Sequence, residues 1–318
     1  MRIVITGGAG FIGSNLANEL CVDNEVLVID NFNNGEKYDN GKRKYFGTFN
    51  NLLEFNGRIW AANLLDDEFY KIIDDFRPEI IYHFAAISDT TVYNEEIVFK
   101  TNINTFYRIL DLAKKHKAKL IYASSASVYG DAPSPQTVGI SECPKNPYAF
   151  SKLTMDKIAK NTGAVGLRYF NVYGKNEFYK DSTASMVLQF GLQILGGNSP
   201  RLFEGSDEIF RDFVYVKDVT SANIAAINAK GGVYNVGSGK ARSFESIVDI
   251  LQDELVKRKI LNKPLEKTYI PNPYKNAYQF HTEAKLDENF SYQPKFSLED
   301  GISDYLDDII KIHKKINS

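Results

Sequence analysis

The 318-residue sequence has little cysteine and almost no excess of charge of either sign. Its two cysteines, Cys21 and Cys143, are too few for a disulfide framework, and neither has a second metal ligand at short spacing. With 38 Lys and Arg against 40 Asp and Glu, the formal net charge is −2. Such a chain has no broad positive field for nucleic acid or an anionic membrane, so any phosphate must be bound locally.

Long hydrophobic runs are also absent. No uninterrupted apolar stretch approaches the ~18 residues that a membrane helix needs, and Arg2–Thr6 has the pattern of a strand rather than of a signal peptide. The four histidines, His83, His116, His281 and His313, form no cluster along the chain, so we expect no metal site. These absences predict a soluble protein of the reducing cytoplasm, with neither nucleic acid nor a membrane as partner.

The first half of the chain contains short apolar runs that alternate with amphipathic stretches. This alternation is typical of a parallel sheet with helices on both faces, and right-handed crossovers then give a doubly wound α/β (Rossmann) sheet. We expect strands at Arg2–Thr6, Glu25–Asp30, Arg58–Asn63, Ile80–Phe84, Lys119–Ser124 and Val165–Tyr169, and helices at Phe11–Leu20, Thr101–Lys114, Tyr148–Lys160, Ser185–Leu195, Ser243–Arg258 and Glu299–Lys314. The ligand crevice should lie at the carboxyl ends of the strands.

A glycine-rich loop follows the first predicted strand and opens the first helix. It reads Thr6-Gly7-Gly8-Ala9-Gly10-Phe11-Ile12-Gly13. Gly7 allows the tight turn, Gly10 the close approach of backbone to a pyrophosphate, and Gly13 the close packing of helix on strand. An anion would then lie on free N–H groups at a helix N-terminus, so the loop predicts a bound dinucleotide.

The form of the dinucleotide depends on residues after the second strand. Asp30 ends that strand, where a carboxylate binds the adenosine ribose and favours NAD. Lys37 and the cluster Lys42-Arg43-Lys44 follow, and cations there could neutralise the 2′-phosphate of NADP. We interpret the cluster as a solvated loop. The residues themselves leave NAD and NADP open.

Three further residues form a candidate catalytic set. Tyr148 and Lys152 stand four apart at the start of a predicted helix, so their side chains project from one face. An ammonium beside a phenol should lower the pKa of the tyrosine and make it a general base. Ser125 follows the fifth strand, where its hydroxyl would hydrogen-bond a substrate oxygen at the crevice.

These residues resemble the extended short-chain dehydrogenase/reductase family. The resemblance rests on the glycine loop, on Tyr122-Ala123-Ser124-Ser125-Ala126-Ser127-Val128-Tyr129-Gly130 and on Tyr148-Ala149-Phe150-Ser151-Lys152. It implies that Tyr148 abstracts a hydroxyl proton while hydride passes to nicotinamide. Lys152 would hold the nicotinamide ribose and Ser125 would polarise the substrate.

The residues around this set indicate which reaction of the family to expect. Sugar dehydratases of the family carry an Asp-Glu pair directly after the catalytic hydroxyl residue, where this chain has Ala126 and Ser127. That difference favours epimerisation, in which the cofactor is regenerated. The segments Arg168–Gly174, Ser182–Met186, Ser199–Ser206 and Arg211–Val216 are similar to the branch of ADP-heptose 6-epimerases. The resemblance implies inversion of C6 of ADP-D-glycero-D-manno-heptose, the precursor of lipopolysaccharide core heptose, by a homo-oligomer that uses NADP, or alternatively NAD.

The resemblance also implies individual roles. Lys180 would be a second acid or base, although an exposed cation or a phosphate contact is the alternative. The cofactor-binding residues would be Gly7, Gly10, Phe11, Ile12, Gly13, Asp30, Asn31, Lys37, Phe84, Ala85, Ala86, Ser88, Asn102, Lys152, Val172 and Lys180. The substrate-binding residues would be Asn171, Ser182, Gln189, Phe203, Glu204, Gly205, Ser206, Arg211 and Tyr278, with Arg211 clamping the pyrophosphate.

The domain division follows from where the alternation of strands and helices ends. After Tyr169 the chain passes into loops rich in Asn, Gly and Tyr. We therefore expect a dinucleotide-binding domain of residues 1–170, with a return segment at about 212–242, and a smaller C-terminal substrate-binding lobe of residues 171–211 and 243–318.

Two other functions remain to be weighed. A UDP-hexose 4-epimerase, or another nucleotide-sugar epimerase, shares the same catalytic set. A non-catalytic dinucleotide sensor keeps the fold but often loses the Tyr or Lys of the set. Ser125, Tyr148 and Lys152 are all present here, which argues against a sensor.

Overall fold

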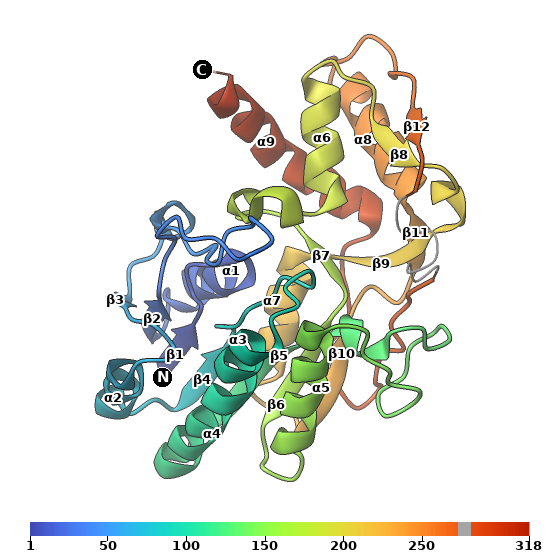
Figure 1. The fold of residues 1–318 in the computed structure, drawn as a ribbon. Helices are drawn as coiled ribbons and strands as arrows, with labels where there is room; N and C mark the ends of the chain where they lie inside the picture. The colour runs from blue at the N-terminus through green and yellow to red at the C-terminus, as the bar shows by residue number, and fades with distance from the viewer. Residues whose placement is uncertain (273–280, 318) are drawn as a thin grey trace.

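The computed structural model describes residues 1–272 and 281–317, and its centre is a seven-stranded parallel sheet (Figure 1). The strands are β1 (Arg2–Thr6), β2 (Glu25–Asp30), β3 (Arg58–Ala61), β4 (Ile80–His83), β5 (Lys119–Ser125), β6 (Val165–Tyr169) and β10 (Gly232–Val236). Their order is β10-β6-β5-β4-β1-β2-β3, so the direction of winding reverses between β1 and β4. The predicted doubly wound fold is confirmed, and the reversal marks where such sheets bind ligands.

Helices cover both faces of the sheet. α1 (Phe11–Leu20) and α7 (Val216–Ala225) pack on one face, while α2 (Asp67–Phe76), α4 (Thr105–His116) and α5 (Pro147–Ala159) pack on the other. Within β1, Ile3 and Ile5 join the first core and Val4 the second, because successive side chains of a strand point to opposite faces.

The helix predicted from Thr101 differs in one respect. It is part of a longer helical run that begins with α3 (Glu95–Phe99) and passes through one π-helical segment, η2 (Lys100–Asn104), into α4. Periodicity does not reveal a π-turn, which adds one residue to a helical turn and is common at functional sites. The π-turn turns out to carry Asn102, a predicted cofactor residue.

The C-terminal part has its own core. The helices α6 (Met186–Leu195), α8 (Phe244–Lys257) and α9 (Leu298–Ile316) pack on one another at the top of Figure 1. The short strands around them are β7 (Asn171–Tyr173), β8 (Arg201–Phe203), β9 (Phe210–Tyr215), β11 (Ala241–Ser243) and β12 (Thr268–Ile270). β7 and β11 flank β9 in one sheet, which leads the chain from the parallel sheet to this second core. The three helices match their predictions to within two residues, whereas the domain boundaries stay a prediction.

Within residues 1–272 and 281–317, no helix combines the length and the apolar character that crossing a membrane requires.

Candidate active site

A cavity of about 850 Å³ opens at the carboxyl ends of the strands, on both sides of the point where the winding reverses. Its wall contains all four predicted catalytic residues: Ser125, Tyr148, Lys152 and Lys180. It also contains fourteen of the sixteen predicted cofactor residues: Gly7, Gly10, Phe11, Ile12, Gly13, Asp30, Asn31, Phe84, Ala85, Ala86, Ser88, Lys152, Val172 and Lys180. Residues far apart in the sequence thus meet where the fold predicts a ligand.

The glycine loop is shaped by close backbone contacts. Gly7 has a φ of +68°, and a Cβ there would lie 2.7 Å from the backbone N of Ala85. A Cβ on Gly13 would overlap the carbonyl oxygen of Gly7. Gly10, the N-cap of α1, has no side chain with which to cap the helix. The first N–H groups of α1 are therefore available to an anion, and the loop fits a dinucleotide pyrophosphate.

Asp30 fastens this loop to the end of β2. Its Oδ2 accepts a hydrogen bond from the Ala9 N–H at 3.0 Å and its Oδ1 accepts one from the Phe32 N–H at 2.8 Å. Burial raises the pKa of Asp30, and these backbone hydrogen bonds oppose the rise. A ribose hydroxyl would therefore have to share an oxygen that already accepts from the backbone and positions the loop.

An extended turn over residues 37–44 places two of its four cations in the cavity wall and two outside it. Lys37 and Arg43 pair as an antiparallel bridge, and neither lies in the cavity wall, whereas Lys42 and Lys44 both do. Cross-strand partners share a face and neighbours in a strand alternate, so Lys42 and Lys44 face opposite to Lys37. The interpretation of the cluster as a solvated loop did not anticipate that Lys42 and Lys44 line the cavity. In the sequence, the spacing of two residues between Lys42 and Lys44 was the only indication that they share a face.

Asn102 lies behind the cavity wall rather than in it. Its Oδ1 accepts a hydrogen bond from the Ile87 N–H at 2.8 Å, and its Nδ2 donates to the Ile87 carbonyl at 2.9 Å and to Ser151 Oγ at 3.0 Å. The side chain is fully buried. Asn102 therefore braces the loop after β4 against α5, and its effect on a cofactor would be indirect.

The catalytic set is built from β5 and α5. Ser125 ends β5, and α5 begins after Asn146, whose side chain caps the Ala149 N–H at 2.8 Å, with Pro147 at the first helical position. This start aligns Tyr148 and Lys152 on the same side of the helix. The Lys152 Nζ lies 5.8 Å from the centre of the Tyr148 ring.

The pKa of Tyr148 is shifted in the direction opposite to the one expected. Desolvation raises the pKa of Tyr148, and its hydrogen bond with Ser125 acts in the opposite direction. Burial also lowers the pKa of Lys152 to about 8, against the influence of Asp156. The net shift of the Tyr148 pKa is therefore upward, opposite to the lowering that was predicted. The loss of solvation in the wall is the largest cause of this rise.

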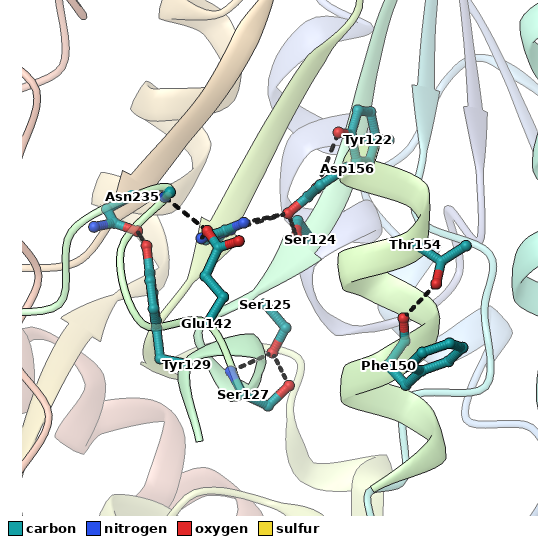
Figure 2. A network of polar contacts seen from close by, with 12 residues as sticks. Tyr122, Ser124, Ser125, Ser127, Tyr129, Glu142, Phe150, Thr154, Asp156 and Asn235 are labelled. Atoms are coloured by element: carbon teal, nitrogen blue, oxygen red, sulfur yellow. Dashed lines mark hydrogen bonds and ion pairs between the residues drawn. The ribbon is translucent and has the colours of Figure 1, made fainter. Parts of the chain in front are cut away.

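A buried ionic network holds α5 against the sheet (Figure 2). Asp156 accepts hydrogen bonds from Arg168 at 2.8 and 2.9 Å, from the Tyr122 hydroxyl at 2.9 Å and from Ser124 Oγ at 3.0 Å. Both Asp156 and Arg168 are less than a tenth exposed. The network joins the helix that carries Tyr148 to the strand that carries Ser125. Sequence reasoning missed it, although Asp156 follows Lys152 by one helical turn.

Lys180 enters the cavity from η4 (Phe178–Thr183). Its Nζ lies 5.3 Å from the centre of the Phe11 ring, at the start of α1. Burial lowers the pKa of Lys180, and the neighbouring carboxylate of Glu177 opposes this change. Glu177 is fully buried and accepts hydrogen bonds from the Gly174 N–H at 3.1 Å and from the Ser185 N–H and Oγ at 2.6 and 2.8 Å.

The predicted substrate residues divide into two groups. Asn171 and Ser182 lie in the wall of the cavity. The others lie outside it, in α6 or in the segment of β8 and β9 that follows: Gln189, Phe203, Glu204, Gly205, Ser206 and Arg211. Gln189 donates to the Ala184 carbonyl at 2.7 Å, and Arg211 to the Phe210 carbonyl at 2.8 Å. Tyr278 lies outside the described residues. The roles of all these residues stay predictions.

In the part of the chain that the structure describes, no three His, Cys, Asp or Glu side chains come together in a way that could hold a metal ion.

Comparison with known proteins identifies the family. The family described as NAD dependent epimerase/dehydratase matches residues 3–237. An ADP-L-glycero-D-manno-heptose-6-epimerase from Brachyspira hyodysenteriae is 35% identical over 298 residues, which are 89% of this chain and 89% of that protein. A nicotinamide cofactor, predicted from the glycine loop, is consistent with the description of the family.

Solved structures agree with this assignment. The crystal structure of Helicobacter pylori ADP-L-glycero-D-manno-heptose-6-epimerase is 43% identical and superposes with a TM-score of 0.87, over 97% of this chain and 96% of that one. UDP-glucose 4-epimerase from Thermotoga maritima is 28% identical, with a TM-score of 0.84 over 98% and 99% of the two chains. The predicted resemblance to ADP-heptose 6-epimerases is confirmed, and the chain belongs to the NAD dependent epimerase/dehydratase family.

Proposed function

We propose that the protein is an isomerase that inverts C6 of ADP-D-glycero-D-manno-heptose and thereby supplies heptose for the lipopolysaccharide core. The observation that carries this proposal is the meeting of two proton-handling groups in one cavity. Tyr148 and Ser125 enter it from α5 and β5, and Lys180 enters it from η4 beside Phe11. The two relatives named as ADP-heptose 6-epimerases support the choice of substrate.

The chemistry of the cavity follows from these groups. Tyr148 takes the proton of the C6 hydroxyl, and Ser125 donates a hydrogen bond to the same oxygen as it becomes a carbonyl oxygen. The nicotinamide ring, when bound, supplies the hydride acceptor and donor. Inversion requires the resulting ketone to present its opposite face. Lys180, whose pKa is lowered by burial, then returns a proton to the oxygen on that side.

We propose NADP as the cofactor, with Lys42 and Lys44 facing its 2′-phosphate. Both lysines line the same cavity as Asp30, and each has a carboxylate partner: Asp89 lies 3.8 Å from Lys42 and Glu36 lies 3.3 Å from Lys44. A phosphate would compete for these ammonium groups. Replacing both lysines by Ala should weaken NADP binding by roughly a hundredfold and NAD binding little, as measured by calorimetry. Equal losses for the two cofactors would refute the assignment.

A UDP-hexose 4-epimerase is the second candidate. It is favoured by the fold similarity to the Thermotoga maritima enzyme and by the identical type of catalytic set. The purified protein, loaded with cofactor, should convert ADP-D-glycero-D-manno-heptose into its L-glycero epimer without added oxidant. UDP-galactose tested in parallel should remain unchanged. The reverse result would select the second candidate.

We further propose that the protein works as a homo-oligomer in the cytoplasm. Large apolar side chains are exposed on α4 and α5, with Tyr107 53% and Phe150 46% accessible, and covering them would stabilise an assembly. Both cysteines are unpaired, which suits a reducing compartment. Light scattering of the purified protein should report a multiple of the 35.9 kDa chain mass.

A further inference from the structure

The hydroxyl of Ser125 accepts two hydrogen bonds from one neighbouring residue (Figure 2). The Ser127 backbone N–H donates to Ser125 Oγ at 3.2 Å, and the Ser127 hydroxyl donates to the same oxygen at 2.9 Å. Ser127 lies in the short helix η3 (Ala126–Tyr129), directly after β5. It is not among the residues that line the cavity, whereas Ser125 is.

The number of hydrogen bonds that a hydroxyl can make determines what remains for Ser125. A serine hydroxyl offers one proton and two acceptor lone pairs. Both lone pairs of Ser125 face Ser127, so its only remaining hydrogen bond is one in which it donates. That proton is left for the cavity, where Tyr148 lies.

The surrounding structure fixes this arrangement. Val128 and Tyr129, which complete η3, are fully buried and hold the backbone of Ser127 in place. The neighbouring hydroxyl of Ser124 points to Asp156 at 3.0 Å, so it does not compete for Ser125. Ser127 is therefore the side chain that sets which way the Ser125 proton points.

We propose that Ser127 is a positioning residue that makes the Ser125 hydroxyl a committed hydrogen-bond donor toward Tyr148 and the substrate oxygen. The part that concerns the substrate oxygen rests on the proposed function, whereas the part that concerns Tyr148 does not. A hydrogen-bond donor suits both Tyr148 and the substrate oxygen. It stabilises the phenolate of Tyr148, and it stabilises charge on the substrate oxygen during hydride transfer. A chain of two hydroxyls that donate in the same direction also strengthens the second hydrogen bond.

The effect of the Ser125 hydrogen bond on the pKa of Tyr148 agrees with this direction of donation. The hydrogen bond from Ser125 opposes the rise that burial causes in the pKa of Tyr148. Without the Ser127 hydroxyl, one lone pair of Ser125 becomes free and its proton is no longer held toward Tyr148. The Ser127 backbone N–H still donates, so the loss should be partial.

The test compares Ser127→Ala with Ser127→Thr, which keeps the hydroxyl. Thr154→Val is the matched control, because it removes a hydroxyl from the exposed side of α5 where Thr154 Oγ1 donates only to the Phe150 carbonyl at 2.9 Å. Tyrosinate absorbance of the NADP-loaded protein is titrated for each variant, and the spectrum of the matching Tyr148→Phe double variant is subtracted. The same proteins are assayed for kcat and KM with ADP-D-glycero-D-manno-heptose over a range of pH.

Ser127→Ala should raise the apparent pKa of Tyr148 by roughly half a unit and lower kcat about fivefold with little change in KM, as expected for one weakened hydrogen bond. Ser127→Thr should restore both values, and Thr154→Val should match the parent. An unchanged Tyr148 titration in Ser127→Ala would overturn the inference. If the parent protein does not turn over the heptose, the proposed function fails, and the titration still decides the role of Ser127.

Discussion

At the scale of single residues, burial controls the charges of the catalytic set. The pKa of the Tyr148 phenol is raised and that of the Lys152 ammonium is lowered to about 8, in both cases mainly through desolvation. Both groups are therefore shifted toward their neutral forms. Tyr148 can act as a base only when a cation and a hydrogen-bond donor favour its phenolate. Lys152 and Ser125 line the same cavity as Tyr148, and an oxidised nicotinamide, when bound there, would add positive charge.

The first prediction concerns Tyr148. Tyr148→Phe keeps the ring in the wall and removes the hydroxyl that is proposed to take the proton. Turnover should fall by at least about a thousandfold, within the range expected for the loss of a general base. The variant should still bind NADP with the affinity of the parent, as measured by calorimetry. Substantial remaining activity would show that another residue is the base.

The second prediction concerns Lys180. Lys180→Met keeps an unbranched chain beside the Phe11 ring and removes the ammonium. Conversion of the heptose should fall by about a hundredfold or more if Lys180 handles a proton. Lys175→Met, in the same segment but paired with Glu54 on the surface at 3.0 Å, is the control and should be nearly normal. Near-normal conversion by Lys180→Met would return Lys180 to the role of a phosphate contact.

Residue identities were easier to predict than residue environments. The spacing of Tyr148, Lys152 and Ser125 was sufficient to place them at one crevice, because strand ends and helix starts converge there. The choice of Lys37 over Lys42 and Lys44 was not supported by the geometry, since the direction in which each side chain points depends on a turn that pairs Lys37 with Arg43. The sign of the Tyr148 pKa shift depends on desolvation, which a sequence does not display.

At the scale of elements, the segment from Gly174 to Ser185 is held at both ends by one carboxylate. Glu177 accepts from Gly174 at the start of the segment and from Ser185, the N-cap of α6, at its end. Lys180 and Ser182 lie between these ends and reach the cavity. A single buried side chain thus ties the position of the proposed second base to the start of α6.

The third prediction tests this tie. Glu177→Ala leaves the Gly174 and Ser185 N–H groups without their acceptor, so the free energy of unfolding should fall by about 2–4 kcal/mol. Glu177→Gln keeps an acceptor oxygen and should cost less. Glu54→Ala removes an exposed carboxylate and should change stability by less than about 0.5 kcal/mol. Urea denaturation measures all three, and similar values for Glu177→Ala and Glu54→Ala would contradict the account.

The strands of the first half were predicted, whereas the strands β7 to β12 and the helix α7 were not. The strand and helix patterns of the first half gave six of the seven strands of the sheet, because the strands inside it are buried on both faces and the helices have an apolar stripe. The three-residue strands β7, β8, β11 and β12 were not predicted, since such short segments are defined by their pairing partners rather than by their own pattern. The π-turn that places Asn102 was missed for a similar reason.

At the scale of the whole molecule, the centre of the sheet contains a histidine that must stay neutral. His83 ends β4, is 1% exposed, and its Nδ1 is hydrogen-bonded to Thr6 Oγ1 at 2.8 Å. Burial lowers its pKa from 6.5 to about 3, and the nearby charge of Lys152 acts in the same direction. Between these values the unfolded chain binds a proton that the folded chain does not. Stability due to His83 is therefore present at neutral pH and is lost as the pH falls through this window.

The fourth prediction follows from the loss of His83-dependent stability as the pH falls. His83→Asn cannot titrate, so the parent should lose its advantage over the variant on acidification. The difference in unfolding free energy between the two should shrink by roughly 2–3 kcal/mol between about pH 7.5 and about pH 4.5. Urea denaturation at a series of pH values measures the difference. A difference that does not depend on pH would show that folding leaves the pKa of His83 unchanged, against this prediction.

If one cavity oxidises and then reduces the same carbon of a heptose, as we propose, the hydrogen at C6 should be kept through the reaction. The NADP-loaded protein is incubated with ADP-D-glycero-D-manno-heptose that carries deuterium at C6, and the product is examined by mass spectrometry and NMR. The expected product is the L-glycero epimer with the deuterium still at C6, because the hydride would leave to the cofactor and return from it. Replacement of that deuterium by solvent hydrogen, or recovery of unchanged substrate, would contradict the proposal.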